Sequence, residues 1–275
     1  MRLENNMYNK EFSDLLVEKR ESVLILTLDN ESMANAITDS MIDSIETVLA
    51  HADEDDEIRC IILTGAGKFF CAGGDIKAME SKSGMFAGES NELRRRYNRG
   101  IQRIPRAIES LKTPIIAMVG GAAIGAGCDL AMMCDLRVSS ERAKFAETFS
   151  KLSLVPGDGG TFFLQRVIGY TKAMEMFLTG DIYSGEQVKE MGLSNYQVSH
   201  DTLLDFTLSL ANKIASNAPI ALSLTKMALK SGRTSSLNDQ LELLSTMQGI
   251  SQRTADHFEG ISAFKEKREA KFTGK

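Results

Sequence analysis

Hydrophobic residues follow two patterns along the chain, short continuous runs and longer periodic stretches. The continuous runs cover residues 22–28, 58–65 and 113–121. They are rich in β-branched residues and bounded by turn residues, so each predicts a strand buried on both faces. Two periodic stretches, residues 38–52 and 98–112, predict amphipathic helices between the strands. Thr38 or Asp39 would cap the first of these helices. Strands that alternate with helices predict an α/β fold.

The pattern changes after about residue 160. From there to residue 272 the chain shows a succession of amphipathic helical patterns, several of which open with Ser, Thr or Asp. The last third is therefore predicted to be helical. Residues 79–90 (MESKSGMFAGES) show neither period and predict a mobile loop, which would be suited to lie beside a site.

Length and composition narrow the class of protein. The chain has 275 residues, of which 43% are hydrophobic, enough for one large core. A net charge of −5 argues against nucleic acid or an anionic membrane surface as a partner, because both favour clustered Lys and Arg. No apolar run approaches the ~18 residues that a membrane span needs, and the N-terminal stretch lacks the apolar core of a signal peptide.

The cysteines indicate a reducing compartment. Cys60, Cys71, Cys128 and Cys134 form no CxxC pair and have no His at metal-ligand spacing. We therefore expect reduced thiols, no metal site and a cytoplasmic protein. Buried cysteines of this kind usually only pack, so neither Cys71 nor Cys128 is expected to act as a nucleophile.

The segment GGAAIGAGCDLAMMCDLR, residues 120–137, is the first candidate for chemistry. It lacks the spacing of the dinucleotide-binding and P-loop motifs. Instead it predicts a Gly/Ala turn followed by a helix that begins near Ala126. The unpaired N–H groups and positive dipole at that helix start would stabilise a carbonyl oxygen that gains negative charge, which is an oxyanion hole. Asp129 falls on the same helix face, about one turn away.

A second segment, FFCAGGDIKAM at residues 69–79, shows the same pattern of small residues followed by a helix start. A predicted strand ends, small residues allow close approach of the backbone, and a short helix follows. The N–H groups of Gly74 and Ala126 are therefore predicted to share one oxygen.

These two segments, with LVPGDGGTFFLQRVIG (154–169), AMEMFLTG (173–180) and GISAFKEKREAKF (260–272), resemble the crotonase superfamily, the enoyl-CoA hydratase/isomerase group. The resemblance runs in order from about residue 15 to residue 275. It implies an α/β fold of the crotonase type, with a β-β-α spiral core over residues 1–200 that holds the acyl-CoA and catalytic site. A helical segment over residues 201–275 would then serve assembly into a homotrimer or a dimer of trimers.

The resemblance also implies roles for individual residues. The amides of Gly74 and Ala126 would hold the thioester oxygen of an acyl-CoA, and Asp129 matches one of the two catalytic glutamates of the family's hydratases. The position of the second glutamate is Phe149 here, which we expect to be a pocket wall. Many relatives with Phe at that position have an acid in the following turn, and here the candidate is Asp158, one residue later than usual.

Glu147 is the alternative second acid. It lies two residues before Phe149 and would share its face if the segment is extended. The simpler interpretation is that Glu147 is solvated or in an ion pair. Asp158, in a Pro-Gly-Asp-Gly sequence, is also a natural turn residue.

For coenzyme A the resemblance implies two groups of contacts. Near the site they are Ala34, Ala36, Ala72, Asp75 and Ile76, with Lys77 close by; Phe264 and Lys267 match positions that reach the CoA of a neighbouring subunit. CoA is part of the substrate, so no separate cofactor is expected.

Three functions stay open at this point. The first is an enzyme that adds water to the double bond of a 2-enoyl-CoA. The second is an isomerase that moves a double bond from the 3- to the 2-position with a single carboxylate. The third is a noncatalytic acyl-CoA-binding relative, against which the retention of Asp129 and both Gly/Ala segments argues.

Overall fold

The computed structural model describes residues 6–275. Its main sheet has six strands in the order β1-β2-β3-β5-β7-β10, and a second sheet has four in the order β4-β6-β8-β9. The main sheet is formed by β1 (Leu15–Arg20), β2 (Val23–Leu28), β3 (Cys60–Gly65), β5 (Ile115–Val119), β7 (Leu136–Ser140) and β10 (Tyr196–Val198). The second is formed by β4 (Phe69–Cys71), β6 (Ala122–Ile124), β8 (Lys144–Ala146) and β9 (Ile182–Ser184). Only the β1–β2 and β8–β9 pairs are antiparallel among the described strands.

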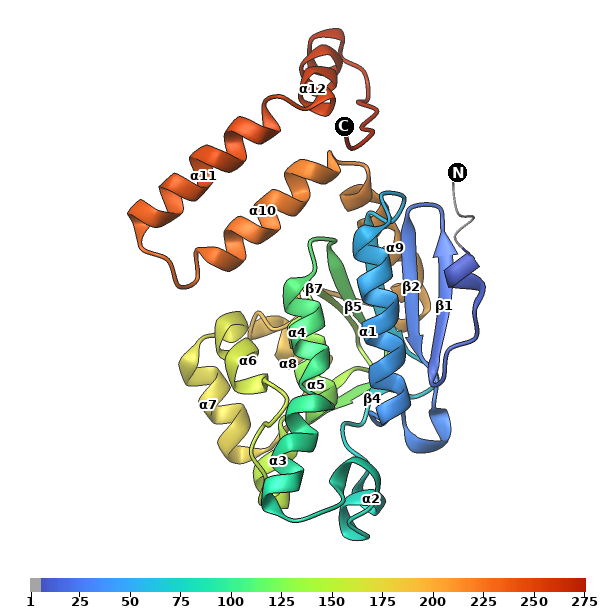
Figure 1. Ribbon diagram of the computed structural model, residues 1–275. Helices are drawn as coiled ribbons and strands as arrows, with labels where there is room; N and C mark the ends of the chain where they lie inside the picture. The colour runs from blue at the N-terminus through green and yellow to red at the C-terminus, as the bar shows by residue number, and fades with distance from the viewer. Residues whose placement is uncertain (1–5) are drawn as a thin grey trace.

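Twelve α-helices accompany the sheets in the described part of the chain. They are α1 (Asp39–Glu54), α2 (Ile76–Glu80), α3 (Ser90–Arg99), α4 (Arg103–Ser110), α5 (Ala126–Met133), α6 (Gly160–Ile168), α7 (Tyr170–Thr179), α8 (Gly185–Glu190), α9 (Leu203–Ala215), α10 (Pro219–Ser231), α11 (Leu237–Ser251) and α12 (Ala255–Glu266). Figure 1 shows α10, α11 and α12 projecting from the body of the molecule. Within residues 6–275, no helix has the length and apolar character needed to cross a membrane.

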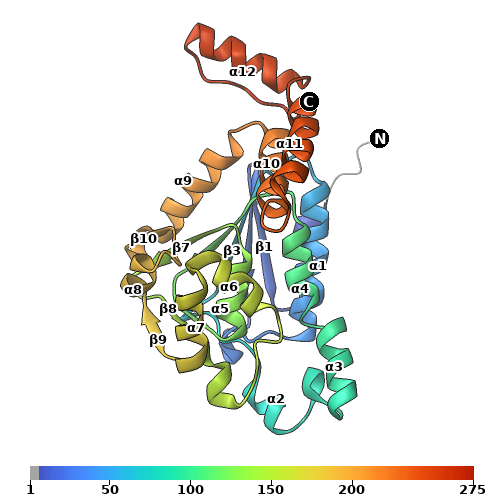
Figure 2. The ribbon, with the colours of Figure 1, turned by 90° about the vertical axis from the view of Figure 1, so that its left-hand side faces the viewer.

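Both faces of the main sheet are covered, as the continuous hydrophobic runs predict. Val23 and Ile25 of β2 pack in one cluster with residues of α9, whereas Leu24 and Leu26 pack in the other with residues of α1 and α4. Figure 2 shows α9 on one side of the sheet and α1 with α4 on the other. Thr38 caps α1 by accepting a hydrogen bond from the Met41 N–H at 3.0 Å.

Several elements differ from the sequence prediction. The predicted helix over residues 98–112 is wrong as one unit, because the chain breaks at Gly100 between α3 and α4. The Gly/Ala turn contains the three-residue strand β6, and the last third contains β9 and β10. These strands are too short for a periodic pattern, and pairing with distant segments creates them. Helix α9 contacts four strands of the main sheet and so belongs to the body of the molecule. We call the projecting helices α10–α12 the arm.

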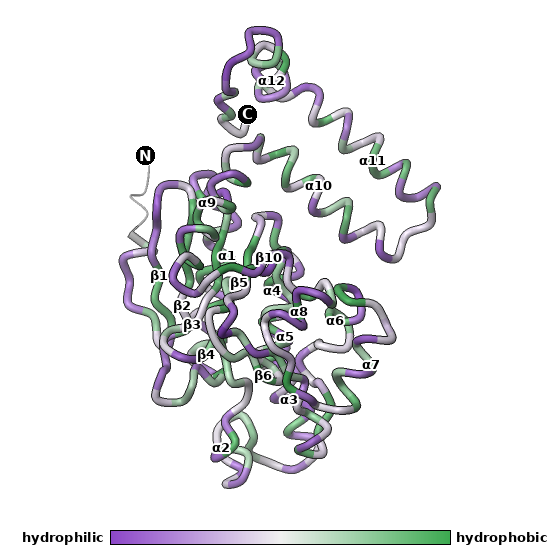
Figure 3. Tube along the Cα trace, turned by 180° about the vertical axis from the view of Figure 1, so that it is seen from behind, coloured by the Kyte–Doolittle hydropathy of each residue, from purple (hydrophilic) through white to green (hydrophobic). Residues whose placement is uncertain are grey.

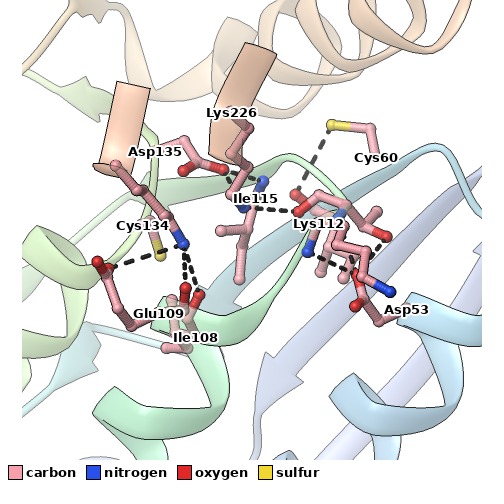
Figure 4. Close-up of polar contacts among 12 residues, drawn as sticks. Asp53, Cys60, Ile108, Glu109, Lys112, Ile115, Cys134, Asp135 and Lys226 are labelled. Carbon is pink, nitrogen blue, oxygen red and sulfur yellow. Dashed lines mark hydrogen bonds and ion pairs between the residues drawn. The ribbon is translucent and has the colours of Figure 1, made fainter. Parts of the chain in front are cut away.

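Two lysines of α10, Lys226 and Lys230, fix the arm to the body, and Figure 4 shows Lys226 beside Asp135. The Lys226 ammonium lies 2.6 Å from a carboxylate oxygen of Asp135 and donates to the Thr113 carbonyl at 2.7 Å. Lys230 donates to the Glu109 carbonyl at the end of α4, where a cation complements the helix dipole. The start of the arm is therefore held by buried polar contacts as well as by apolar packing.

Candidate active site

The two glycine segments lie against each other. A Cβ atom on Gly73 would lie 2.7 Å from the Ile124 carbonyl oxygen and 3.2 Å from the Ala126 nitrogen. Gly73 (φ +88°) also has backbone angles that only glycine adopts without strain. The N–H groups of Gly74 and Ala126 donate no hydrogen bond to the described residues. The structure thus brings the two oxyanion candidates together with their donors free.

Helix α5 starts at Ala126, as the sequence predicts, and packs closely on β4. A methyl group on Gly127 would overlap the Cys71 carbonyl, so only glycine permits this approach. Gly125 precedes the helix with φ +54°, and its N–H donates to the Ala146 carbonyl at 2.7 Å. The glycines therefore place the helix start, and with it Asp129, relative to β4 and β8.

The residues expected around CoA fall into separate places. Ala72 donates its N–H to the Ala34 carbonyl at 3.0 Å, and Ile37 donates to Gly73 at 2.8 Å. The backbone carrying Ala34 and Ala36 thus borders the first glycine segment. Sequence reasoning missed Asn35, whose buried side chain holds this loop by donating to the Phe69 carbonyl at 2.8 Å.

The other expected CoA contacts are more exposed. Asp75 caps α2 by accepting from the Lys77 N–H at 2.9 Å, and the Ile76 and Lys77 side chains are exposed. Phe264, which is 86% exposed, and Lys267, the C-cap of α12, lie on the arm. Neither Phe264 nor Lys267 lines the pocket of its own chain that contains Gly74, Ala126 and Asp158.

One pocket joins both oxyanion candidates with an acid. Its lining residues are Gly74, Met79, Met85, Phe86, Arg96, Tyr97, Ile101, Ala126, Phe149, Leu154, Gly157 and Asp158. Phe149 is one of its walls. The methionines and Phe86 come from residues 79–90, so this segment borders the pocket. It is not an irregular loop throughout, because Gly84–Phe86 forms a short 3-10 helix, η3. Tyr97 was not predicted, since most residues of α3 are charged or polar.

Three carboxyl groups form a buried cluster next to the pocket. Asp129 and Glu147 are fully buried and Asp158 is 2% exposed. None of their oxygens accepts a hydrogen bond from an N–H or hydroxyl group of the described residues. Asp129 lies between the other two and contacts both carboxyl groups. Asp158 is the member that borders the pocket.

Burial raises the pKa of all three acids. For Asp129 the pKa lies well above its ordinary range, first because of burial and then because of the adjacent Glu147 and Asp158. Burial raises the pKa of Glu147 to about 8 and also raises the pKa of Asp158. Carboxyl groups this close share protons rather than ionise together. Burial likewise raises the pKa of the Cys71 thiol to about 12, which argues against a thiolate nucleophile.

The structure corrects the interpretation of Glu147. It is neither solvated nor, among the described residues, in an ion pair. The segment after it is not extended, because Thr148–Leu152 forms a short 3-10 helix, η4. The Asp129 carboxylate also fits closely against Gly160, the first residue of α6, where a methyl group would overlap it. Neither the burial of Glu147 nor the contact between Asp129 and Gly160 is indicated by the local sequence.

Known proteins resemble this chain over nearly its whole length. Residues 18–275 match the family model described as Enoyl-CoA hydratase/isomerase. The chain is 37% identical to the 1,2-epoxyphenylacetyl-CoA isomerase of Escherichia coli K12, over 95% of this chain and 98% of that protein. It is 32% identical to the crotonyl-CoA hydratase of Syntrophomonas wolfei, over 96% and 99%.

Solved structures extend the likeness to the fold. The enoyl-CoA hydratase from Bacillus anthracis superimposes with a TM-score of 0.90 at 33% identity, covering 96% of this chain and 100% of that one. The chain therefore belongs to the enoyl-CoA hydratase/isomerase family. The resemblance and the α/β fold class inferred from sequence are confirmed.

Proposed function

We propose that this protein is an enzyme that hydrates the double bond of a 2-enoyl-CoA. The observation that carries the proposal is the pocket that combines the free N–H groups of Gly74 and Ala126 with the Asp158 carboxyl. Two backbone donors aimed at one oxygen would stabilise the thioester enolate that forms when the double bond is attacked.

Hydration needs one group to activate water and one to deliver a proton to Cα. Asp158 is placed to take the proton from water, since it borders the pocket. Asp129 contacts Asp158 and keeps its proton at neutral pH, because burial raises its pKa. As the water oxygen adds to Cβ, Asp158 would take one proton from the water, and the Asp129–Asp158 pair would deliver one proton to Cα, so that the pair ends the reaction with the protons it started with. The acidity comes from the chain's own residues, and we propose that no metal or cofactor beyond the CoA of the substrate takes part.

One observation favours isomerisation as a second candidate. Of the three clustered acids, only Asp158 borders the pocket, and Phe149 forms a wall there. A single carboxylate suffices to move a proton between two carbons of a 3-enoyl-CoA, whereas hydration usually uses two acids.

Turnover of two different substrates distinguishes hydration from isomerisation. The purified protein is given a short 2-enoyl-CoA and, separately, a 3-enoyl-CoA, and the absorbance of the conjugated thioester is followed. Loss of absorbance with the 2-enoyl substrate supports hydration. If that substrate stays intact while the 3-enoyl substrate gains absorbance, hydratase is wrong and isomerase replaces it. Binding in a thermal-shift assay without turnover of either substrate would indicate a noncatalytic relative.

Assembly into a homotrimer or a dimer of trimers is part of the proposal. The chain exposes 14938 Å², whereas a compact protein of 30.2 kDa exposes about 11,700 Å². The arm carries much of the apolar excess, as the alternating hydrophobic positions of α10 and α11 in Figure 3 illustrate. Its large exposed apolar residues are Met227, Leu229, Leu237, Leu241, Leu244, Ile250, Phe258, Ile261 and Phe264. Light scattering that gave a monomer at micromolar concentration would contradict this assembly.

Trimer formation would give Phe264 and Lys267 a role, because they lie outside their own pocket. We infer that they contact the CoA of a neighbouring subunit, while the backbone near Ala34 and Ala72 contacts the CoA of its own chain. A cytoplasmic location is inferred from the four cysteines, all free and buried.

A further inference from the structure

Glu147 is a buried acid that the proposed hydration does not use. It stands at the start of η4, directly after β8, yet its side chain does not cap that helix. The carboxyl group points inward, where it contacts the Asp129 carboxyl and the Cys128 thiol. The hydrogen bond from Gly125 to Ala146 fixes this position, because it joins the end of β8 to the start of α5.

The three acids differ in their access to the pocket. Asp129 contacts both of the other carboxyl groups, and Asp158 is the member that borders the pocket. The other titratable groups near the cluster are Tyr97, Cys71 and Cys128, with Arg137 near Cys128 and Arg96 in the lining of the pocket that Asp158 borders. Arg137 is committed elsewhere, since its guanidinium donates to the backbone carbonyls of Leu193 and Cys134. Within residues 6–275, no lysine, arginine or histidine forms an ion pair with any of the three acids.

Three adjacent carboxyl groups without a cation cannot all be ionised. A single negative charge is best tolerated where it meets the pocket, which is at Asp158. Asp129 and Glu147 then stay protonated. The proton of Asp129 needs a hydrogen-bond acceptor in this buried position, and a neighbouring carboxyl group must provide it. Among the described residues, the side chains that contact the Glu147 carboxyl group are Asp129 and Cys128.

We propose that Glu147 is a positioning residue, whose carboxyl group shares a proton with Asp129 and thereby keeps the charge of the cluster on Asp158 at the pocket. Glu147 itself touches no substrate. Its removal would let Asp129 ionise or turn away, and Asp158 would then lose either its charge or its proton-donating neighbour.

The first test needs no substrate and therefore does not depend on the proposed function. Protonated carboxyl groups have an infrared C=O band that carboxylates lack. At neutral pH the wild type should show buried protonated carboxyl groups, and Glu147→Gln should lose part of that band. Glu186→Gln removes an exposed acid of α8 and serves as the matched control, with an unchanged band. An unchanged band in Glu147→Gln would overturn the proposal.

The second test uses turnover and rests on the proposed function. In the wild type kcat/KM should fall above about pH 8, when the cluster loses its second proton and a second negative charge opposes the enolate. Glu147→Gln cannot lose that proton, yet its amide oxygen still accepts one from Asp129, so the alkaline limb should move up by about one pH unit or more. KM should stay within about threefold.

Glu147→Ala removes the acceptor altogether, and its kcat should fall by ~10-fold or more. A merely structural role predicts the same alkaline limb in the wild type and Glu147→Gln, and that result would refute the proposal. If no enoyl-CoA is turned over by the wild type, the proposed function fails, whereas the infrared result still decides the role of Glu147.

Discussion

Gly160 gives the sharpest test of how Asp129 is held. It is the first residue of α6 and its φ is not in the left-handed region, so the backbone accepts alanine. The added methyl group would nevertheless overlap the Asp129 carboxylate. Overpacking of a buried site costs ~1–3 kcal/mol, and the helix gains at most ~1 kcal/mol from replacing Gly by Ala. We expect Gly160→Ala to lower the free energy of unfolding by about 1–2 kcal/mol, or Tm by roughly 2–8 °C.

The effect on turnover should be larger than the effect on stability. A shift of a catalytic group by about 1 Å typically lowers the rate ~10²-fold. The assays are thermal unfolding and conversion of a short enoyl-CoA by the folded variant. Gly249→Ala is the matched control, because Gly249 lies in α11 with no atom within 4 Å of a new methyl group, and this variant should be slightly stabilised with normal turnover. Wild-type activity and stability in Gly160→Ala would refute the close contact between Gly160 and Asp129.

Three further predictions follow from the buried polar groups. Asp129→Asn should keep acyl-CoA affinity while turnover falls ~10²-fold or more in a steady-state assay, and normal turnover would remove Asp129 from the mechanism. Lys226→Met should lower the free energy of unfolding by about 2–3 kcal/mol in urea melts, because it leaves the Asp135 carboxylate without its cation. Lys172→Met, which breaks an exposed ion pair, should change the free energy of unfolding by less than ~0.5 kcal/mol. If Lys226→Met and Lys172→Met have equal effects, Lys226 does not anchor the arm. Between about pH 5 and 8 the native Glu147 binds more protons than the unfolded chain, so stability should fall as pH rises, by up to ~1.4 kcal/mol per pH unit. Urea melts should show a smaller fall in Glu147→Gln, and an identical pH dependence would count against the raised pKa.

The elements that the sequence predicted well are those with long, uniform patterns. Strands β2, β3 and β5 have continuous hydrophobic runs because both faces are buried, and α1 carries a regular period with a capping Thr38. The edge strand β1 was missed, since its LLVEKR sequence leaves most side chains exposed. Strands β6, β9 and β10 have three residues each, too few for any period.

The candidate site was predicted in part. Gly74 and Ala126, the proposed oxyanion residues, and the acids Asp129 and Asp158 were selected from two glycine segments and a family resemblance. The role of Glu147 could not be predicted, because the direction of its side chain depends on η4 and on the hydrogen bond between Gly125 and Ala146. Likewise, the fit of Asp129 against Gly160 joins residues 31 positions apart in the printed sequence, and only packing of α5 on α6 creates it.

The close backbone contacts at Gly73 and Gly127 have a consequence for how such enzymes diversify. They fix the Gly74 and Ala126 N–H groups, the proposed oxyanion donors, through main-chain atoms, so these donors do not depend on which side chains surround the pocket. The acids, by contrast, are side chains, which come from α5, the residue before η4 and the turn before α6. A substitution such as Phe149→Glu would therefore alter proton transfer while polarisation of the thioester stays intact. A scaffold of this kind can acquire a new reaction by exchanging one side chain, without rebuilding the part that activates the substrate.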